Sequence, residues 1–94
     1  MIYCLIVYDI VDDKTRRIVS DILEQYGTRV NRSVFECSFK TSQRLQQLKK
    51  LILQEIEPKT DSVRIYPLCQ SCLDKSWVTP NEPSPFEQNA IYFF

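Results

Sequence analysis

Histidine is missing from this 94-residue sequence, and glycine occurs only once. Without histidine the chain cannot build a Ser-His-Asp triad, a Cys-His pair or a histidine-ligated zinc site. A single glycine cannot form the glycine-rich loop that cradles nucleotide phosphates, so we do not expect nucleoside triphosphate chemistry. Catalysis by this chain would therefore depend on carboxylates and a metal ion.

Long hydrophobic runs are also absent. The apolar stretch 2–8 ends at Asp9, far short of a membrane span, and it has neither the basic flank nor the cleavage site of a signal peptide. We therefore expect a cytoplasmic protein with no membrane partner. In that compartment the four cysteines should be free thiols rather than disulfides.

The charges are unevenly distributed, although 12 basic and 12 acidic residues give a formal net charge of zero. Residues 14–50 hold nine basic side chains against three acidic ones, a local excess of six positive charges. Such segregation can leave a basic surface for phosphate groups on a neutral protein. A solvated helix face gives the same count, so charge alone leaves both interpretations open.

Hydrophobic periodicity predicts four strands and two helices. Residues 2–8 form a continuous apolar run, which is typical of a strand buried on both faces. Helical spacing follows from about residue 13 to 26, with Asp12 or Asp13 as N-cap and Gly27 as a left-handed C-terminal stop. The remaining predicted elements are strands over 28–32, 33–39 and 62–69, and a second helix from Thr41 or Ser42 to just before Pro58, with an apolar stripe of Leu45, Leu48, Leu51, Ile52 and Ile56.

The order β-α-β-β-α-β predicts an α+β ferredoxin-like sandwich over residues 1–78, with both helices on one face of the sheet. The residues of the first strand are apolar on both faces of the sheet. The face that the helices leave uncovered should therefore be an interface. Residues 79–94 are predicted to be a proline-rich linker and a C-terminal strand at 91–94, for which the four-stranded core has no place. We expect a face-to-face homodimer in which this strand pairs with a sheet edge, in its own or the partner subunit.

Asp9 is a candidate for chemistry because it follows the most buried predicted strand. A carboxylate there is costly unless it is solvated, paired or bound to a cation. It can cap the turn or pair with Arg16 or Arg17, or it can bind Mg²⁺ or Mn²⁺. One carboxylate holds such an ion poorly, but a two-fold axis across the open sheet face would bring two copies of Asp9 to one ion.

Arg16, Arg17, Arg29 and Arg32 cluster around the predicted first helix and second strand. Guanidinium groups bind phosphate oxygens in pairs, and the resulting affinity for nucleic acid is independent of sequence and sensitive to salt. The alternative is that these arginines solubilise the surface or pair with carboxylates nearby.

Cys69 and Cys72 form one Cys-x-x-Cys motif, and the predicted strand order places Cys4 and Cys37 toward the same end of the sheet. A four-thiolate zinc site is geometrically conceivable, but ordinary packing of buried thiols is the better interpretation, and redox chemistry is favoured less than either. We interpret Trp77 as a core or interface anchor rather than a platform for stacked bases.

Five segments form a combination that is far more specific than any one of them: YDI at 8–10, DDK at 12–14 followed by Arg16-Arg17, YG at 26–27, RVNRSVFE at 29–36 and DSVRIY at 61–66. Together they resemble the small CRISPR-associated protein of the adaptation module, the Cas-two family. The resemblance extends from residue 1 to about residue 68.

The resemblance implies a ferredoxin-like homodimer that bridges two dimers of the Cas-one integrase and holds the protospacer DNA duplex during spacer acquisition. It also implies a metal-dependent nuclease that acts on RNA or double-stranded DNA, with Asp9 as the catalytic, metal-binding residue. Family positions map onto Tyr8, Arg16, Arg29 and Phe35, while Arg17 and Arg32 are further candidates for nucleic-acid binding and Ser33 for a supporting role. A basic residue frequent in the family's first helix is Ile18 here, and a common glutamine is Asn31, so the substrate contacts match less well than the fold.

Three functions are compatible with these observations. We expect a Mg²⁺-dependent phosphodiester endonuclease of CRISPR adaptation, whose cleavage can be dispensable in the cell. The alternatives are a non-catalytic DNA-binding scaffold of the integration complex and a toxin-like interferase that cleaves messenger RNA. Replacing Asp9 with alanine separates the first two, since it should abolish cleavage in the first and leave spacer acquisition untouched in the second.

Overall fold

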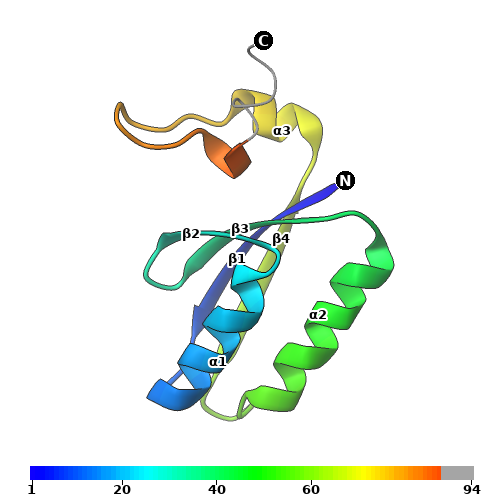
Figure 1. The fold of residues 1–94 in the computed structure, drawn as a ribbon, viewed down its shortest axis with the longest axis vertical. Helices are drawn as coiled ribbons and strands as arrows, with labels where there is room; N and C mark the ends of the chain where they lie inside the picture. The colour runs from blue at the N-terminus through cyan, green and yellow to red at the C-terminus, as the bar shows by residue number, and fades with distance from the viewer. Residues whose placement is uncertain (88–94) are drawn as a thin grey trace.

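The fold is a four-stranded antiparallel sheet with two helices on one face, seen in a computed structural model that describes residues 1–87 (Figure 1). The sheet order is β2-β3-β1-β4. The strands are β1 (Ile2–Asp9), β2 (Gly27–Asn31), β3 (Val34–Phe39) and β4 (Ser62–Leu68), and the covering helices are α1 (Asp13–Glu24) and α2 (Ser42–Glu55). The predicted ferredoxin-like α+β arrangement is confirmed.

The core lies between the sheet and the two helices. Alternation along β1 buries Cys4, Ile6 and Tyr8 against the helices, and β3 contributes Phe35, Cys37 and Phe39 to the same layer. The helices add Val19, Leu23, Leu45, Leu48 and Ile52. Leu51 was predicted to belong to the apolar stripe of α2, but its side chain is 41% exposed. It lies one residue from Ile52, which is about 100° around the helix, and therefore faces solvent.

Both helices begin at the predicted kind of cap. The Asp12 carboxylate accepts a hydrogen bond from the Thr15 backbone N–H at 2.9 Å, and this bond holds the pKa of Asp12 below its usual value. The Thr41 hydroxyl accepts from the Arg44 N–H at 3.2 Å. These caps satisfy backbone donors that the first turn leaves unpaired.

Gly27 does not act as the predicted left-handed helix stop. Helix α1 ends at Glu24 with a right-handed C-cap at Gln25, and Gly27 is the first residue of β2 with no positive φ. Its role comes from proximity, because a Cβ atom built at this position would lie 2.0 Å from the Glu36 carbonyl oxygen. Only a residue without a side chain allows β2 and β3 to approach this closely.

Ser33 lies in the turn between β2 and β3, whereas the sequence predicted it as the first residue of the third strand. The register shifts between Arg29 and Asn31, so the hairpin uses one more residue on β2 than strict pairing would. The Ser33 carbonyl accepts a hydrogen bond from the Tyr8 N–H at 3.0 Å. The turn is thereby attached to the end of β1.

A short helix that was not predicted from the sequence, α3 (Gln70–Lys75), follows β4 and buries Leu73. The chain beyond it turns back toward the sheet near the amino terminus (Figure 1). Trp77 in this segment is 78% exposed and therefore does not belong to the core.

The face of the sheet opposite the helices was predicted to be uncovered, but part of it is covered. A 3-10 turn, η1 (Pro85–Glu87), places the Phe86 ring edge-on against Tyr3, with ring centroids 5.6 Å apart. The Phe86 N–H also donates to the Glu36 carboxylate at 2.8 Å. The chain's own tail thus covers part of this face of the sheet. We call it the open face and define it by Tyr3, Leu5, Val7 and their neighbours on β3 and β4. The predicted strand at 91–94 lies outside the described residues.

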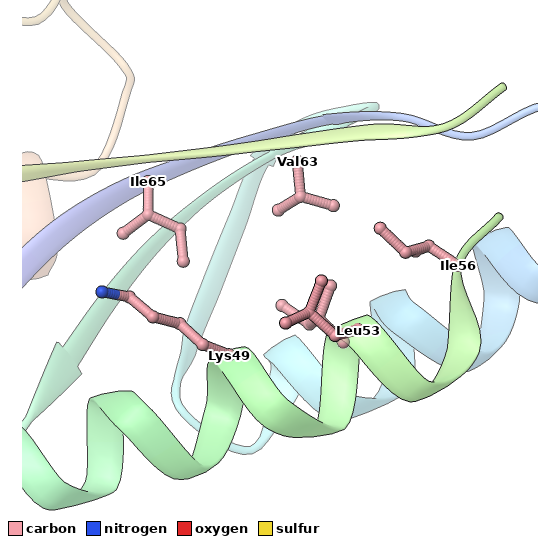
Figure 2. A pocket seen from close by; sticks show the side chains of 6 residues that line it. Lys49, Leu53, Ile56, Val63 and Ile65 are labelled. Carbon is pink, nitrogen blue, oxygen red and sulfur yellow. The ribbon is translucent and has the colours of Figure 1, made fainter. Parts of the chain in front are cut away.

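Strand β4 forms one edge of the sheet, and an apolar groove of about 290 Å³ lies between it and α2. Figure 2 shows the side chains of Lys49 and Leu53 in α2, and of Ile56 at its end, facing Val63 and Ile65 of β4. Within residues 1–87, every helix is too short or too polar to span a bilayer.

Candidate nucleic-acid interface

The four arginines predicted from the sequence line one groove of about 360 Å³ beside α1, together with Tyr8. We call it the arginine groove. Three carboxylates line it as well, those of Asp13, Asp21 and Glu24, so its lining carries an excess of one positive charge. The carboxylates make the electrostatic potential of the groove less positive. The distinguishing feature of the groove is that guanidinium groups from a helix, a strand and a turn lie together in it.

Arg29 is anchored at the side of the groove. Its guanidinium carbon lies 5.5 Å from the centroid of the Phe35 ring, and an Nη atom donates a hydrogen bond to the Ser20 hydroxyl. Ser20 is buried and Phe35 is fully enclosed in the core. The predicted supporting residue Phe35 therefore acts from beneath the surface, as a flat surface on which Arg29 rests.

Arg16 is committed to the loop that connects β1 with α1. Its guanidinium donates to the carbonyl of Ile10 at 3.2 and 3.1 Å, to that of Val11 at 3.2 Å, and to the Asp13 carboxylate at 2.7 Å. These four bonds use most of the five N–H donors of an arginine. These bonds hold the loop in place. The predicted contact of Arg16 with nucleic acid stays a prediction.

Arg17 and Arg32 are the available cations of the groove. Both are exposed, and neither guanidinium has a hydrogen bond or ion pair among residues 1–87. Arg32 is held through its backbone instead, because its carbonyl accepts from the Tyr8 hydroxyl at 3.3 Å and its N–H donates to Asn31 at 2.7 Å. An arginine with a fixed backbone and a free side chain is suited to bind an anion from solvent.

Asp9 lies away from the arginine groove. It is the last residue of β1, is exposed, and pairs with Ser62 of β4. By the alternation of the strand it shares the open face with Leu5 and Val7, whereas Tyr8 points to the helices. The structure therefore brings the arginines together but separates them from Asp9, which projects from the other side of the sheet.

The predicted ion pair between Asp9 and Arg16 or Arg17 does not form. Arg16 pairs with Asp13, and across the described part of the chain the Asp9 carboxylate has no side-chain partner. A solvated, unpaired carboxylate is a free oxygen donor for a hard cation.

Asp61 is a structural residue of this region to which the sequence analysis assigned no role. Its two carboxylate oxygens accept from the Val11 N–H at 3.1 Å and the Glu57 N–H at 2.9 Å, and the Thr60 hydroxyl donates at 3.2 Å. These bonds, the one from Glu57 first, hold the pKa of Asp61 below its usual value. Asp61 thus fastens the loop after Asp9 to the turn before β4, and a Pro-Lys-Thr-Asp turn was the only local signal for it.

The sequence profile described as CRISPR associated protein Cas2 matches residues 1–76. The chain belongs to this family. The resemblance found in the sequence is therefore confirmed.

The similarity extends to individual members. A protein of Chloroflexus aurantiacus named CRISPR-associated endoribonuclease Cas2 1 is 39% identical over 93 residues, which cover 96% of this chain and 97% of the relative. The crystal structure of Streptococcus pyogenes Cas2 is 33% identical, with a TM-score of 0.73 over 82% of this chain and 98% of that one. A chain of a partial Cas6-RT-Cas1–Cas2 complex is 40% identical, with a TM-score of 0.72 over 83% and 90% of the two chains.

A divalent metal ion is implied by the family resemblance, and the residues of one chain meet its needs in part. Asp9 offers a carboxylate, the donor that Mg²⁺ and Mn²⁺ prefer. Across residues 1–87, however, no group of three or more carboxylates and thiols is arranged so that it could hold a metal ion. The four-thiolate zinc site that the sequence left conceivable is excluded by the same observation. Asp9 is the residue predicted from the sequence to bind the metal ion, and the described residues of one chain of this Cas2-family protein do not complete a site around it.

Proposed function

We propose that this protein acts in CRISPR adaptation as a homodimer that binds nucleic acid, bridges a Cas-one integrase and cleaves phosphodiester bonds with the help of Mg²⁺ or Mn²⁺. The observation that carries the proposal is the arginine groove, in which a Cas2-family chain gathers the four arginines predicted to bind phosphate. Relatives named endoribonucleases support the cleavage, and the similarity to a chain of a Cas1–Cas2 complex supports the partner.

Arg17 and Arg32 would make the primary contacts with the backbone of a protospacer DNA duplex or of RNA. Their guanidinium groups are free to pair with phosphate oxygens, and Arg29 and Arg16 keep the walls of the groove in place. Such contacts hold the nucleic acid without reading its bases. Tyr8, Ser33 and Phe35 would support them from below: Tyr8 bonds to the Arg32 and Ser33 carbonyls, and its ring centroid lies 6.3 Å from that of Phe35.

Asp9 would be the catalytic and metal-binding residue. When bound, Mg²⁺ supplies positive charge for the scissile phosphate and lowers the pKa of water. A second carboxylate must come from a second chain, and the place of Asp9 at the end of the open face suits a dimer that pairs these faces. Dimerisation would then complete the site.

The tail from residue 79 onward would form a unit distinct from the domain of residues 1–78. Phe86 now covers Tyr3 and bonds to Glu36, so a face-to-face dimer must either displace this contact or keep it at the rim of the interface. The predicted strand at 91–94 would pair with a sheet edge. Strand β4 offers such an edge with an apolar groove beside it (Figure 2).

The experiment compares purified wild type with Asp9→Ala and Arg17→Ala in cleavage and binding of a DNA duplex and of single-stranded RNA. We expect Asp9→Ala to abolish cleavage and to keep binding, and EDTA to have the same effect on the wild type. Arg17→Ala should weaken binding and lower the slope of log affinity against log salt by about one for each phosphate group that the variant no longer neutralises. Lys50→Ala, an exposed change outside the groove, is the matched control.

Cleavage that survives both the Asp9 change and chelation would overturn the catalytic part of the proposal. Cleavage that is absent from the wild type, together with tight binding and intact spacer acquisition by Asp9→Ala, would favour the non-catalytic scaffold. Unchanged affinity and salt slope in Arg17→Ala would remove the groove from the interface.

A further inference from the structure

Cys69 and Cys72 form a pair of adjacent thiols on the surface. Their sulfur atoms lie 3.4 Å apart, and both residues are exposed. A disulfide bond is about 2.05 Å long, so each sulfur would have to move by only roughly 0.7 Å to form one. No other part of the described chain places two exposed sulfurs together.

The backbone holds the two thiols in this arrangement. The Cys72 and Leu73 N–H groups both donate to the Cys69 carbonyl at 3.1 Å, and the Ser76 hydroxyl donates to the Cys72 carbonyl at 2.8 Å. Leu73 is 3% exposed and anchors the turn in the body of the molecule. Because the turn is fixed, closing the bond requires side-chain rotation rather than refolding.

The Cys69 sulfur is also the better nucleophile of the two. The Ser71 hydroxyl lies 3.1 Å from it, and hydrogen bonds from Ser71 and then from Cys72 lower the pKa of Cys69 to about 7. The hydrogen bond between the two thiols raises the pKa of Cys72, and the charge of a Cys69 thiolate raises it as well, because the two thiols cannot both ionise at this separation. Near neutral pH a larger fraction of Cys69 than of Cys72 is therefore in the thiolate form.

Cys4 and Cys37 provide an internal comparison. They face each other across β1 and β3, but both are fully buried. Burial raises the pKa of Cys37 to about 12, and it raises that of Cys4 as well. These two thiols are packing residues that small reagents cannot reach in the folded chain.

We propose that Cys69 and Cys72 are a reversible dithiol–disulfide site that exchanges with disulfides of low molecular weight, such as oxidised glutathione. The Cys69 thiolate attacks one sulfur of the disulfide, its S–S bond breaks, and one thiol leaves. The Cys72 thiolate then attacks Cys69 Sγ in the mixed disulfide and releases the second thiol. The Cys69–Cys72 pair loses two electrons and two protons, and the two released thiols carry them. This site does not depend on the proposed function.

The test incubates the full folded chain in glutathione buffers of stepped redox ratio, traps free thiols by alkylation and locates the bonds by mass spectrometry of peptides. We expect one intrachain bond between residues 69 and 72, with Cys4 and Cys37 left reduced and unlabelled until the chain is unfolded. Cys69→Ser and Cys72→Ser should each form a glutathione adduct at the remaining thiol and no intrachain bond. Reduction by dithiothreitol should restore the starting mass.

The two single variants also test which thiol attacks first. At pH 7 the remaining thiol of Cys72→Ser should be alkylated about ten-fold faster than that of Cys69→Ser, because only Cys69 retains the bond from Ser71. Equal rates would overturn this order of attack. A chain that stays fully reduced, or that forms only bonds between chains, while circular dichroism shows it folded, would overturn the proposal.

Discussion

Single carboxylates organise the loop that carries the candidate catalytic residue. Asp12 caps α1, Asp13 pairs with Arg16, and Asp61 reaches across from the turn before β4. Together they determine the course of the chain that leaves Asp9. The position of Asp9 therefore depends on residues that take no part in chemistry.

Asp61→Asn should destabilise the fold in a pH-dependent way. The Val11 and Glu57 N–H groups bond to different oxygens of Asp61, and an amide would place an NH2 donor against one of these two N–H groups. Because folding lowers the pKa of Asp61, its contribution is complete at pH values above the usual carboxyl range and is lost as the pH falls through the lowered pKa. The denaturation midpoints of wild type and variant should thus differ at pH 7 and converge below about pH 4.

The measurement is urea denaturation followed by circular dichroism at stepped pH. Glu55→Gln, an acid-to-amide change at the exposed end of α2, is the control and should not change the midpoint at pH 7. A difference between wild type and Asp61→Asn that stays constant from pH 7 to low pH would contradict the role given to the charge.

At the scale of elements, the β2–β3 hairpin depends on one close approach of two backbones. Gly27, the first residue of β2, packs closely against the Glu36–Cys37 peptide of β3. The position of β2 in turn determines where Arg29 and Arg32 project. The arginine groove and the hairpin are therefore one structural unit.

Gly27→Ala should destabilise the protein by about 2–3 kcal/mol, because backbone atoms surround the new methyl group and only separation of the strands relieves the overlap. Thermal unfolding by calorimetry measures the change. Val30→Ala, at an exposed position of the same strand, should shift stability by about 0.5 kcal/mol or less. A Gly27→Ala protein as stable as the wild type would mean that the two strands are not held at this distance.

At the scale of the whole molecule, the open face of the sheet is the surface through which the proposed dimer would form. The Phe86 turn covers Tyr3, while Leu5 and Val7 stay half-buried beside Glu36. A small domain with such a face gains stability by self-association.

Leu5→Glu should convert a dimer into a folded monomer. The new carboxylate would lie opposite Glu36 in the β1–β3 register, and a face-to-face dimer would have to bury these two like charges together. Sedimentation velocity at micromolar concentration checks this, with Leu51→Glu, on the exposed side of α2, as a control that should remain dimeric. A monomeric wild type would refute the dimer, and with it the shared Asp9 site.

Local patterns predicted the four strands, the two long helices and their order. Alternation predicted one shared face for Phe35, Cys37 and Phe39, which the structure buries, and residue type limited the N-caps to Asp12 or Asp13 and to Thr41 or Ser42. These features are local, because a strand or a helix repeats its own geometry over a few residues. The family resemblance, confirmed over residues 1–76, rested on short segments of the same kind.

The tertiary structure decided what depends on contacts between distant segments. Gly27 serves close strand packing rather than a helix end, Phe86 covers part of the open face, and Asp61 closes a loop 50 residues away. The sequence also could not separate Asp9 from the arginines or bring the sulfurs of Cys69 and Cys72 within 3.4 Å of each other. Residue type and spacing determine which conformations a segment prefers, but distances across the fold exist only once the sheet register and the helix packing are set.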